Sequence, residues 1–310
     1  MPKELVRLTK DYFGFFICSF ALDVGPYTVE PINNFASVVG KILKRKNPET
    51  GFLYPIGAVY KADSKNKDGL KKIPHSDKQM HLYKMPATYS IYLKTNQQLP
   101  EDFRLKDGAL IIHLLAFLFK SRAQFSDWYF DTPFPLKQDR IASFNKKELK
   151  RAVNTIYTSF SKWNKDAQTS YINALYLHAR SIAYEWEWER FIMEYIITDS
   201  LWKLCTNHLQ LISNKKKINH GDRIRKMCEK FDVQYKQTEI DYIVALRNDL
   251  FHEGFWDKVI PRHDTGTSSA FYAMLNLRKI NQRLLLAIPG LDCSFVKSDW
   301  TCKGMWGLYS

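Results

Sequence analysis

Cysteine is scarce in this sequence and shows no paired spacing. The 310 residues contain five cysteines, an odd number, and no two of them form a CxxC pair. A disulfide framework needs an even set and a zinc ribbon needs closely spaced pairs, so we expect neither. A reducing cytoplasm is the simplest location for such a chain. The cysteines are Cys18, Cys205, Cys228, Cys293 and Cys302.

Long apolar runs are also missing. A membrane-spanning helix needs about 20 consecutive apolar residues, and no run in this sequence approaches that length. Residues 12–22 are largely apolar and follow Lys3, Arg7 and Lys10, as in a secretion signal. Acidic residues interrupt that basic region, however, and no small-x-small cleavage site follows. We therefore expect no membrane partner and interpret 12–22 as a buried strand.

Several motifs that would identify an enzyme class do not occur. The sequence has no P-loop, no GxGxxG, no GxSxG and no HExxH. Glycine (13) and proline (12) are too few for a low-complexity chain. We expect no cofactor and no metal site in a globular protein.

What the chain does have is positive charge. Lys and Arg number 46 against 32 Asp and Glu, a formal net charge of +14. A strongly basic protein favours acidic partners, among which the RNA or DNA backbone is the commonest. Solubility alone is the other interpretation of the same charge.

The two halves of the chain show different periodicity. Residues 1–140 contain short apolar runs separated by turn residues, a pattern typical of strands. Residues 141–310 show apolar residues at spacings of three and four, which predict helices. We therefore predict an α+β protein in which an N-terminal β-rich or mixed domain (1–140) precedes an all-α helical bundle (141–310).

Individual helices are marked by local signals. Asn145 followed by Glu148 is a capping-box pattern that predicts a helix start. A second helix with apolar residues over 172–182 is expected to continue, or kink, into residues 188–202. Another runs from about Thr238 to His252 and ends at Gly254, because glycine is a common residue after a helix C-terminus.

One arginine lies on the apolar face of that last helix. A rotation of about 100° per residue places Arg247 among its apolar side chains. Asn248 and His252 then lie together at the edge of this face, one turn apart. A buried guanidinium is costly without a partner, so Arg247 either pairs with a carboxylate or serves a ligand. The apolar side chains are Ile240, Ile243, Val244, Leu246, Leu250 and Phe251.

The combination of these residue types suits a phosphodiester. An arginine neutralises phosphate charge, an imidazole transfers protons near neutral pH, and an asparagine can orient either of them. The segment Arg247-Asn248-Asp249-Leu250-Phe251-His252 resembles the RNxxxH motif of HEPN (higher eukaryotes and prokaryotes nucleotide-binding) domains. Residues 141–290 as a whole resemble ApeA-like HEPN proteins.

This resemblance implies a function. HEPN domains are helical bundles that commonly form homodimers, and their nuclease members cleave RNA without metal to a 2′,3′-cyclic phosphate and a 5′-hydroxyl. It implies that His252 transfers protons, Arg247 stabilises charge on phosphorus and Asn248 orients its neighbours. A role in bacterial antiviral defence or in a toxin system is the implied context. Other HEPN domains have lost cleavage, so a catalytically silent RNA-binding, nucleotide-binding or dimerisation module is the alternative.

A basic run upstream is a candidate RNA-binding surface, with a solvated loop as the other interpretation. An acidic stretch, Glu185 to Glu194, is either a solvated helix face or a source of a carboxylate partner for Arg247. The six basic residues predicted to bind RNA are Lys215, Lys216, Lys217, Arg223, Arg225 and Lys226.

Overall fold

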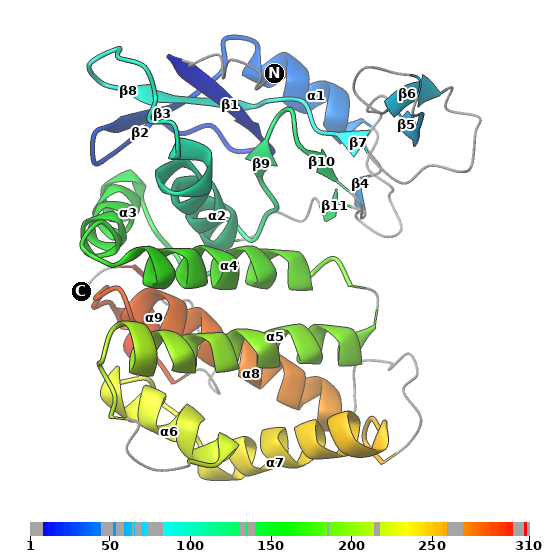
Figure 1. Cartoon of the computed structure of the whole chain (residues 1–310), viewed down its shortest axis with the longest axis vertical. Helices are drawn as coiled ribbons and strands as arrows, with labels where there is room; N and C mark the ends of the chain where they lie inside the picture. Colours follow the sequence, from blue (N-terminus) through cyan, green and yellow to red (C-terminus); the bar gives the residue numbers. More distant parts are fainter. Residues whose placement is uncertain are drawn as a thin grey trace. The chain divides into compact units, whose positions relative to one another are not determined.

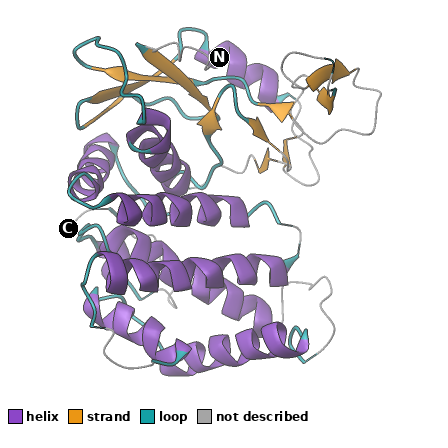
Figure 2. Cartoon of the chain, in the orientation of Figure 1, coloured by secondary structure: helices purple, strands orange, loops and turns teal. Residues whose placement is uncertain are grey.

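The protein is described by a computed structural model in which the chain divides into two compact units, Met1–Arg140 and Ile141–Ser310. The first unit is built on an antiparallel sheet and the second on helices, so the predicted mixed α+β class is confirmed (Figures 1 and 2). The described residues are 9–44, 52–53, 59–63, 65, 70–73, 83–130, 134–135, 140–184, 186–213, 218–258, 269–299 and 307–308.

The first unit contains a five-stranded antiparallel sheet in the order β2-β3-β8-β1-β9. Shorter pairs are formed by β10 with β7, β11 with β4 and β5 with β6. The strands are β1 Lys10–Gly14, β2 Leu22–Val24, β3 Tyr27–Pro31, β4 Phe52–Leu53, β5 Val59–Ala62, β6 Leu70–Ile73, β7 Tyr83–Lys84, β8 Tyr89–Leu93, β9 Gln124–Phe125, β10 Tyr129–Phe130 and β11 Phe134–Pro135.

The strand predicted over 12–22 is shorter than expected. β1 ends at Gly14. Beyond it the Phe15 N–H donates to the Arg122 carbonyl (3.4 Å), and the backbone groups that follow bond to side chains in place of a strand ladder. The Phe16 N–H donates to Thr88 Oγ1 (3.1 Å), and the Tyr89 hydroxyl donates to the Cys18 carbonyl (2.5 Å). The segment is nevertheless part of the core, because Phe16 is fully buried against the Tyr89 ring.

Among the described residues of this unit the helical segments are α1 Phe35–Leu43, the 3₁₀ turn η1 Phe103–Leu105 and α2 Asp107–Leu118. α2 carries the most apolar run of the sequence, and every residue from Gly108 to Leu118 is buried. Continuous burial explains why its periodicity does not distinguish helix from strand. His113 in this run is a buried core residue, and burial lowers its pKa to about 4.

The second unit consists of helices, of which α4 and α5 run side by side, as do α6 and α7 (Figure 1). The capping box at the start of α3 is confirmed: Asn145 Oδ1 accepts from the Glu148 N–H (3.0 Å) and Glu148 Oε2 from the Asn145 N–H (2.8 Å). The elements are α3 Lys146–Phe160, α4 Lys165–Ser181, α5 Glu187–Lys203, the π-helical turn η2 Leu204–His208, α6 His220–Lys230, α7 Gln237–Asn248, the π-helical turn η3 Asp249–Glu253, α8 Ser269–Ala287 and α9 Ser294–Lys297.

The second predicted helix proves to be two. α4 ends at Ser181, and the chain reverses before α5 begins at Glu187. Side-chain hydrogen bonds help to stabilise the reversal. Ser181 Oγ donates to Glu194 Oε1 (2.7 Å), and Arg190 Nε donates to the Tyr184 carbonyl (2.8 Å). Apolar spacing continues through the reversal in the sequence, which is why the pattern suggested one helix.

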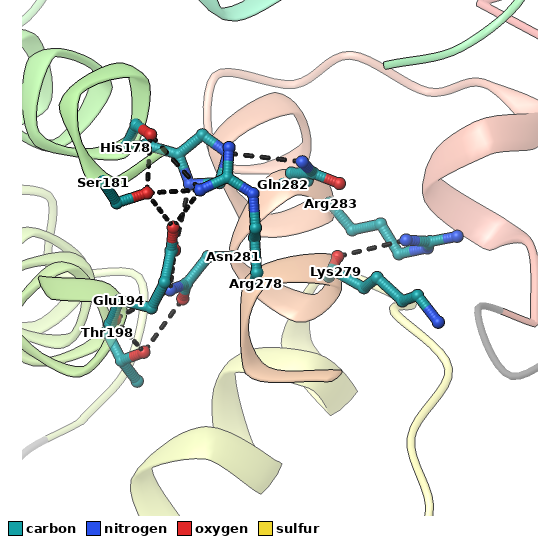
Figure 3. Close-up of polar contacts among 9 residues, drawn as sticks. All are labelled: His178, Ser181, Glu194, Thr198, Arg278, Lys279, Asn281, Gln282 and Arg283. Atoms are coloured by element: carbon teal, nitrogen blue, oxygen red, sulfur yellow. Dashed lines mark hydrogen bonds and ion pairs between the residues drawn. The ribbon is translucent and has the colours of Figure 1, made fainter. Parts of the chain in front are cut away.

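A buried polar network holds α5 in place (Figure 3). The fully buried Glu194 carboxylate lies 3.0 Å from His178 Nδ1 of α4 and 2.5 Å from Arg278 Nη1 of α8. It also accepts from Ser181 and from Asn281 Nδ2 (3.0 Å). Burial alone would raise the pKa of Glu194, but the charges of His178 and Arg278 outweigh it and lower that pKa to about 2. α5 is therefore fixed between α4 and α8.

Candidate functional site

The candidate motif lies where α7 passes into η3. Ile240, Ile243, Leu246 and Leu250 are buried, as the predicted apolar face requires, whereas Phe251 is 47% exposed. The turn ends at Gly254, whose φ of 72° lies in the left-handed region that favours glycine. The prediction of a helix ending at Gly254 is thus confirmed.

The π-helical turn brings Arg247 to His252. In an α-helix two residues five positions apart differ by about 140° in direction, so their side chains would diverge. A π-turn pairs residues i and i+5 instead, and here the Gly254 N–H bonds to the Asp249 carbonyl. Arg247 Nη1 consequently lies 3.2 Å from His252 Nε2.

Asn248 completes this group of three. Its Oδ1 accepts a hydrogen bond from the same Arg247 Nη1 at 3.1 Å. The rotation of an α-helix predicts that Asn248 lies next to His252. In the described part of the chain, each of these residues instead bonds to Arg247, and they do not bond to each other. Asn248 therefore orients the guanidinium directly, and the imidazole through it. Both Asn248 and His252 are exposed.

The Arg247 guanidinium has aromatic neighbours and no carboxylate partner among the described residues. Its central carbon lies 5.0 Å from the ring centroid of Phe251 and 5.8 Å from that of Tyr195, at cation–π distance. Its Nε is enclosed without a hydrogen-bond partner in the same described part. Glu194, from the acidic stretch considered as a source of partners, pairs with Arg278 instead. A half-buried positive charge is thus left uncompensated, which suits an anionic ligand.

A second set of polar side chains approaches from α5 and the start of α6. The ring centroid of His220 lies 5.7 Å from that of Tyr195, which also contacts Arg247. His220 Nδ1 faces Asp199 Oδ1 at 3.7 Å, and Arg223 Nη1 reaches the same carboxylate oxygen at 3.3 Å. Two imidazoles, two guanidiniums and a phenol are therefore gathered around one exposed region of the helical unit.

The environment changes the acidity of two of these groups. Burial lowers the pKa of His220, and the nearby charges of Arg247 and Arg223 act in the same direction against the Asp199 carboxylate. Burial also raises the pKa of the Tyr195 hydroxyl well above its ordinary value. Tyr195 is consequently a neutral hydrogen-bonding group, whereas the lowered pKa of His220 makes its protonated form a stronger acid than an ordinary imidazolium.

The predicted RNA-binding residues are placed unequally. Arg223 belongs to the group just described. Arg225 pairs with Asp222 and hydrogen-bonds to Gln237 Oε1 (3.3 Å), whereas Lys226 is exposed. Lys215, Lys216 and Lys217 lie outside the described residues.

Three contributors are absent from the predicted site residues. Tyr195 and Asp199 lie within 188–202, where apolar spacing predicts only a helix, and His220 lies between the predicted RNA-binding residues Lys217 and Arg223. A spacing of four residues between Tyr195 and Asp199 is the one signal that places them on a common helix face. Because all three residues are far from His252 in the sequence, no sequence pattern connects them to that histidine.

No protein-family model matches the chain, and neither a curated protein nor a solved structure does. Across the described ranges no three His, Cys, Asp or Glu side chains group as a metal site. Within those ranges no helix combines the length and apolarity needed to cross a membrane.

Proposed function

We propose that the protein is a metal-independent endoribonuclease of the HEPN type. The observation that carries the proposal is the Arg247–His252 pair: an uncompensated guanidinium 3.2 Å from an imidazole nitrogen at an exposed helix end. The same two residue types are the ones that RNA cleavage through the ribose 2′-hydroxyl requires.

Each side chain has a part in this reaction. His252 takes the proton from the 2′-hydroxyl or supplies one to the leaving 5′-oxygen. Arg247 stabilises the additional negative charge that develops on the phosphate oxygens. Asn248 holds Arg247 in position through its 3.1 Å hydrogen bond. The products are a 2′,3′-cyclic phosphate and a 5′-hydroxyl.

RNA as the substrate is supported by charge. The chain carries a net charge of +14, and α6 carries Arg223, which contacts Asp199 of the group, and the exposed Lys226. Phosphate contacts of this kind give affinity without sequence preference. We further propose a cytoplasmic location, in keeping with free Cys205, Cys228 and Cys293, and a role in bacterial antiviral defence or a toxin system.

A homodimer formed through the helical unit is part of the same proposal. Phe251 and Phe255 are 47% and 39% exposed beside the motif, and Ile196 of α5 is 40% exposed. Exposed apolar side chains clustered at one site are typical of association surfaces. Sedimentation of the intact protein measures this directly.

The test is cleavage of mixed RNA in the presence of EDTA. Removal of a general acid or base lowers a rate by about 100-fold or more, so we expect His252→Ala to lose cleavage while its circular dichroism spectrum is unchanged. His208→Ala, in η2, is the matched control, since it removes a half-buried histidine outside the group and should cleave like the wild type. Equal cleavage by the wild type and His252→Ala contradicts the proposal. RNA binding without cleavage by the wild type would identify the silent module instead.

A further inference from the structure

Cleavage through the 2′-hydroxyl requires two proton transfers on opposite sides of phosphorus. The 2′-oxygen loses a proton as it attacks, and the 5′-oxygen gains one as it leaves, with the two oxygens roughly in line. A single imidazole placed on one side of the phosphate reaches only one of these oxygens. The motif supplies one histidine, so the proposed reaction leaves the second transfer without a residue.

The structure places another histidine against the same tyrosine ring as the Arg247 guanidinium. Tyr195 connects the two: its ring lies 5.8 Å from the guanidinium carbon of Arg247 and 5.7 Å from the ring of His220. His252 contacts Arg247 through Nη1 at 3.2 Å. Tyr195 thus links Arg247, which contacts His252 of η3, to His220 of α6, so both imidazoles belong to one group of side chains.

His220 is oriented for proton transfer. Its Nδ1 is enclosed and faces Asp199 Oδ1 at 3.7 Å, yet 27% of the side chain is exposed. Nδ1 is directed at the carboxylate, so Nε2 is the ring nitrogen that is not directed at Asp199. The carboxylate behind Nδ1 stabilises the protonated ring, and Arg223 holds that carboxylate from the other direction at 3.3 Å.

The two histidines have different neighbours. His252 Nε2 receives an N–H from Arg247, and only an unprotonated nitrogen can do so. It is thus ready to accept a proton once Arg247 turns to the phosphate. His220 has an anionic group at Nδ1, which favours the protonated ring, but burial and the two arginines outweigh it. The protonated ring therefore gives up its proton more readily than an ordinary imidazolium.

We propose that His220 is the general acid of this site and protonates the departing 5′-oxygen, while His252 acts as the base. This inference rests on the proposed ribonuclease function. His252 removes the 2′-hydroxyl proton, the 2′-oxygen forms a bond to phosphorus, and the bond from phosphorus to the 5′-oxygen breaks. The His220 proton passes to that oxygen, so the products are the cyclic phosphate and the 5′-hydroxyl with no other reactant.

Four groups control the protonation of His220. Asp199 and Tyr195 face it from α5, Arg223 from its own helix and Arg247 from α7. Asp199 favours the charged ring, whereas burial and both arginines oppose it. The protonated form of His220 is consequently lost as pH rises. Cleavage by the wild type should therefore decline on the alkaline side of its pH profile.

The experiment compares two RNA oligonucleotides that differ at the linkage which the wild type cleaves. One has the natural bridging 5′-oxygen, and the other has sulfur there, which leaves as a thiolate without needing a proton. We expect His220→Ala and His220→Gln to cleave the natural RNA at least about 100-fold more slowly than the wild type. On the sulfur-bridged RNA the cleavage rate of the same variants should fall by less than about 5-fold, whereas His252→Ala should lose activity on both RNAs.

Several results would overturn the inference. Equal losses by the His220 variants on both RNAs would show that His220 does not protonate the leaving group. If His220→Gln cleaved the natural RNA as fast as the wild type, His220 would have no part in the reaction. The ribonuclease proposal itself would be unaffected by that result. An inactive wild type would instead refute the proposed function and this inference together. His208→Ala serves again as the control, and the helical circular dichroism signal confirms that each variant is folded.

Discussion

Glu194→Gln is expected to destabilise the helical unit by about 3 kcal/mol. The carboxylate is fully buried and its partner Arg278 is 15% exposed, so loss of the charge leaves a guanidinium enclosed without an anion. Removing one member of a buried ion pair costs roughly 3–5 kcal/mol. Glutamine retains hydrogen-bonding capacity toward Ser181 and Asn281, which places the expected cost at the lower end.

The pKa of Glu194 gives the same magnitude. It falls from 4.5 to about 2 in the folded protein, and each pH unit corresponds to about 1.4 kcal/mol, which again amounts to about 3 kcal/mol. A carboxyl group with a lowered pKa contributes stability above its unfolded value and loses it as pH falls through the folded value. The difference between wild type and variant should therefore be complete at neutral pH and shrink between about pH 4.5 and about pH 2.

Urea unfolding followed by helical circular dichroism measures the effect on the intact chain. Glu189→Gln is the matched control, because it makes the same change on α5 at a half-buried cap position where the amide oxygen can still accept from the Trp186 N–H. We expect that variant to lie within about 0.5 kcal/mol of the wild type. A loss below about 1 kcal/mol for Glu194→Gln, or one that does not diminish in acid, would refute the reasoning that the charge organises this network.

Two further substitutions test local structure. Asn145→Ala removes the capping box of α3 and should cost about 1 kcal/mol in urea unfolding; an unchanged midpoint would show that the cap contributes nothing. Gly254→Ala should cost about 1–2 kcal/mol, because a Cβ there meets open space but the φ of 72° disfavours any L side chain. The same variant should also weaken cleavage by disturbing η3, so wild-type stability and activity together would contradict its role.

Much of the fold could be predicted where the signal is local. The capping box at Asn145, the end of the helix at Gly254 and the apolar period between them are properties of neighbouring residues. The reversal between α4 and α5 depends on contacts with Glu194, thirteen residues beyond Ser181. The irregular segment after Gly14 depends on Thr88 and Tyr89. Partners this distant in sequence leave no periodic trace.

The candidate site divides in the same way. Arg247, Asn248 and His252 could be selected because they are close in sequence. The α-helical rotation nevertheless paired Asn248 with His252, since apolar spacing does not distinguish a π-turn from an α-turn. His220 and Tyr195 come from two other helices, and only tertiary packing brings them to Arg247.

The π-turn at Asp249–Glu253 gives the spacing of the motif a meaning of its own. The arginine and the histidine lie five positions apart in the sequence. The wider coil of the π-turn brings residues at that separation to the same side of the helix. If the turn relaxed to α-geometry at its present length, the arginine and the imidazole would point about 140° apart. With one residue deleted as well, they would lie four positions apart and face each other again. The pairing therefore depends on the match between the length of the segment and the width of its coil, so a change in either one alone would separate the two side chains although both remained in the chain.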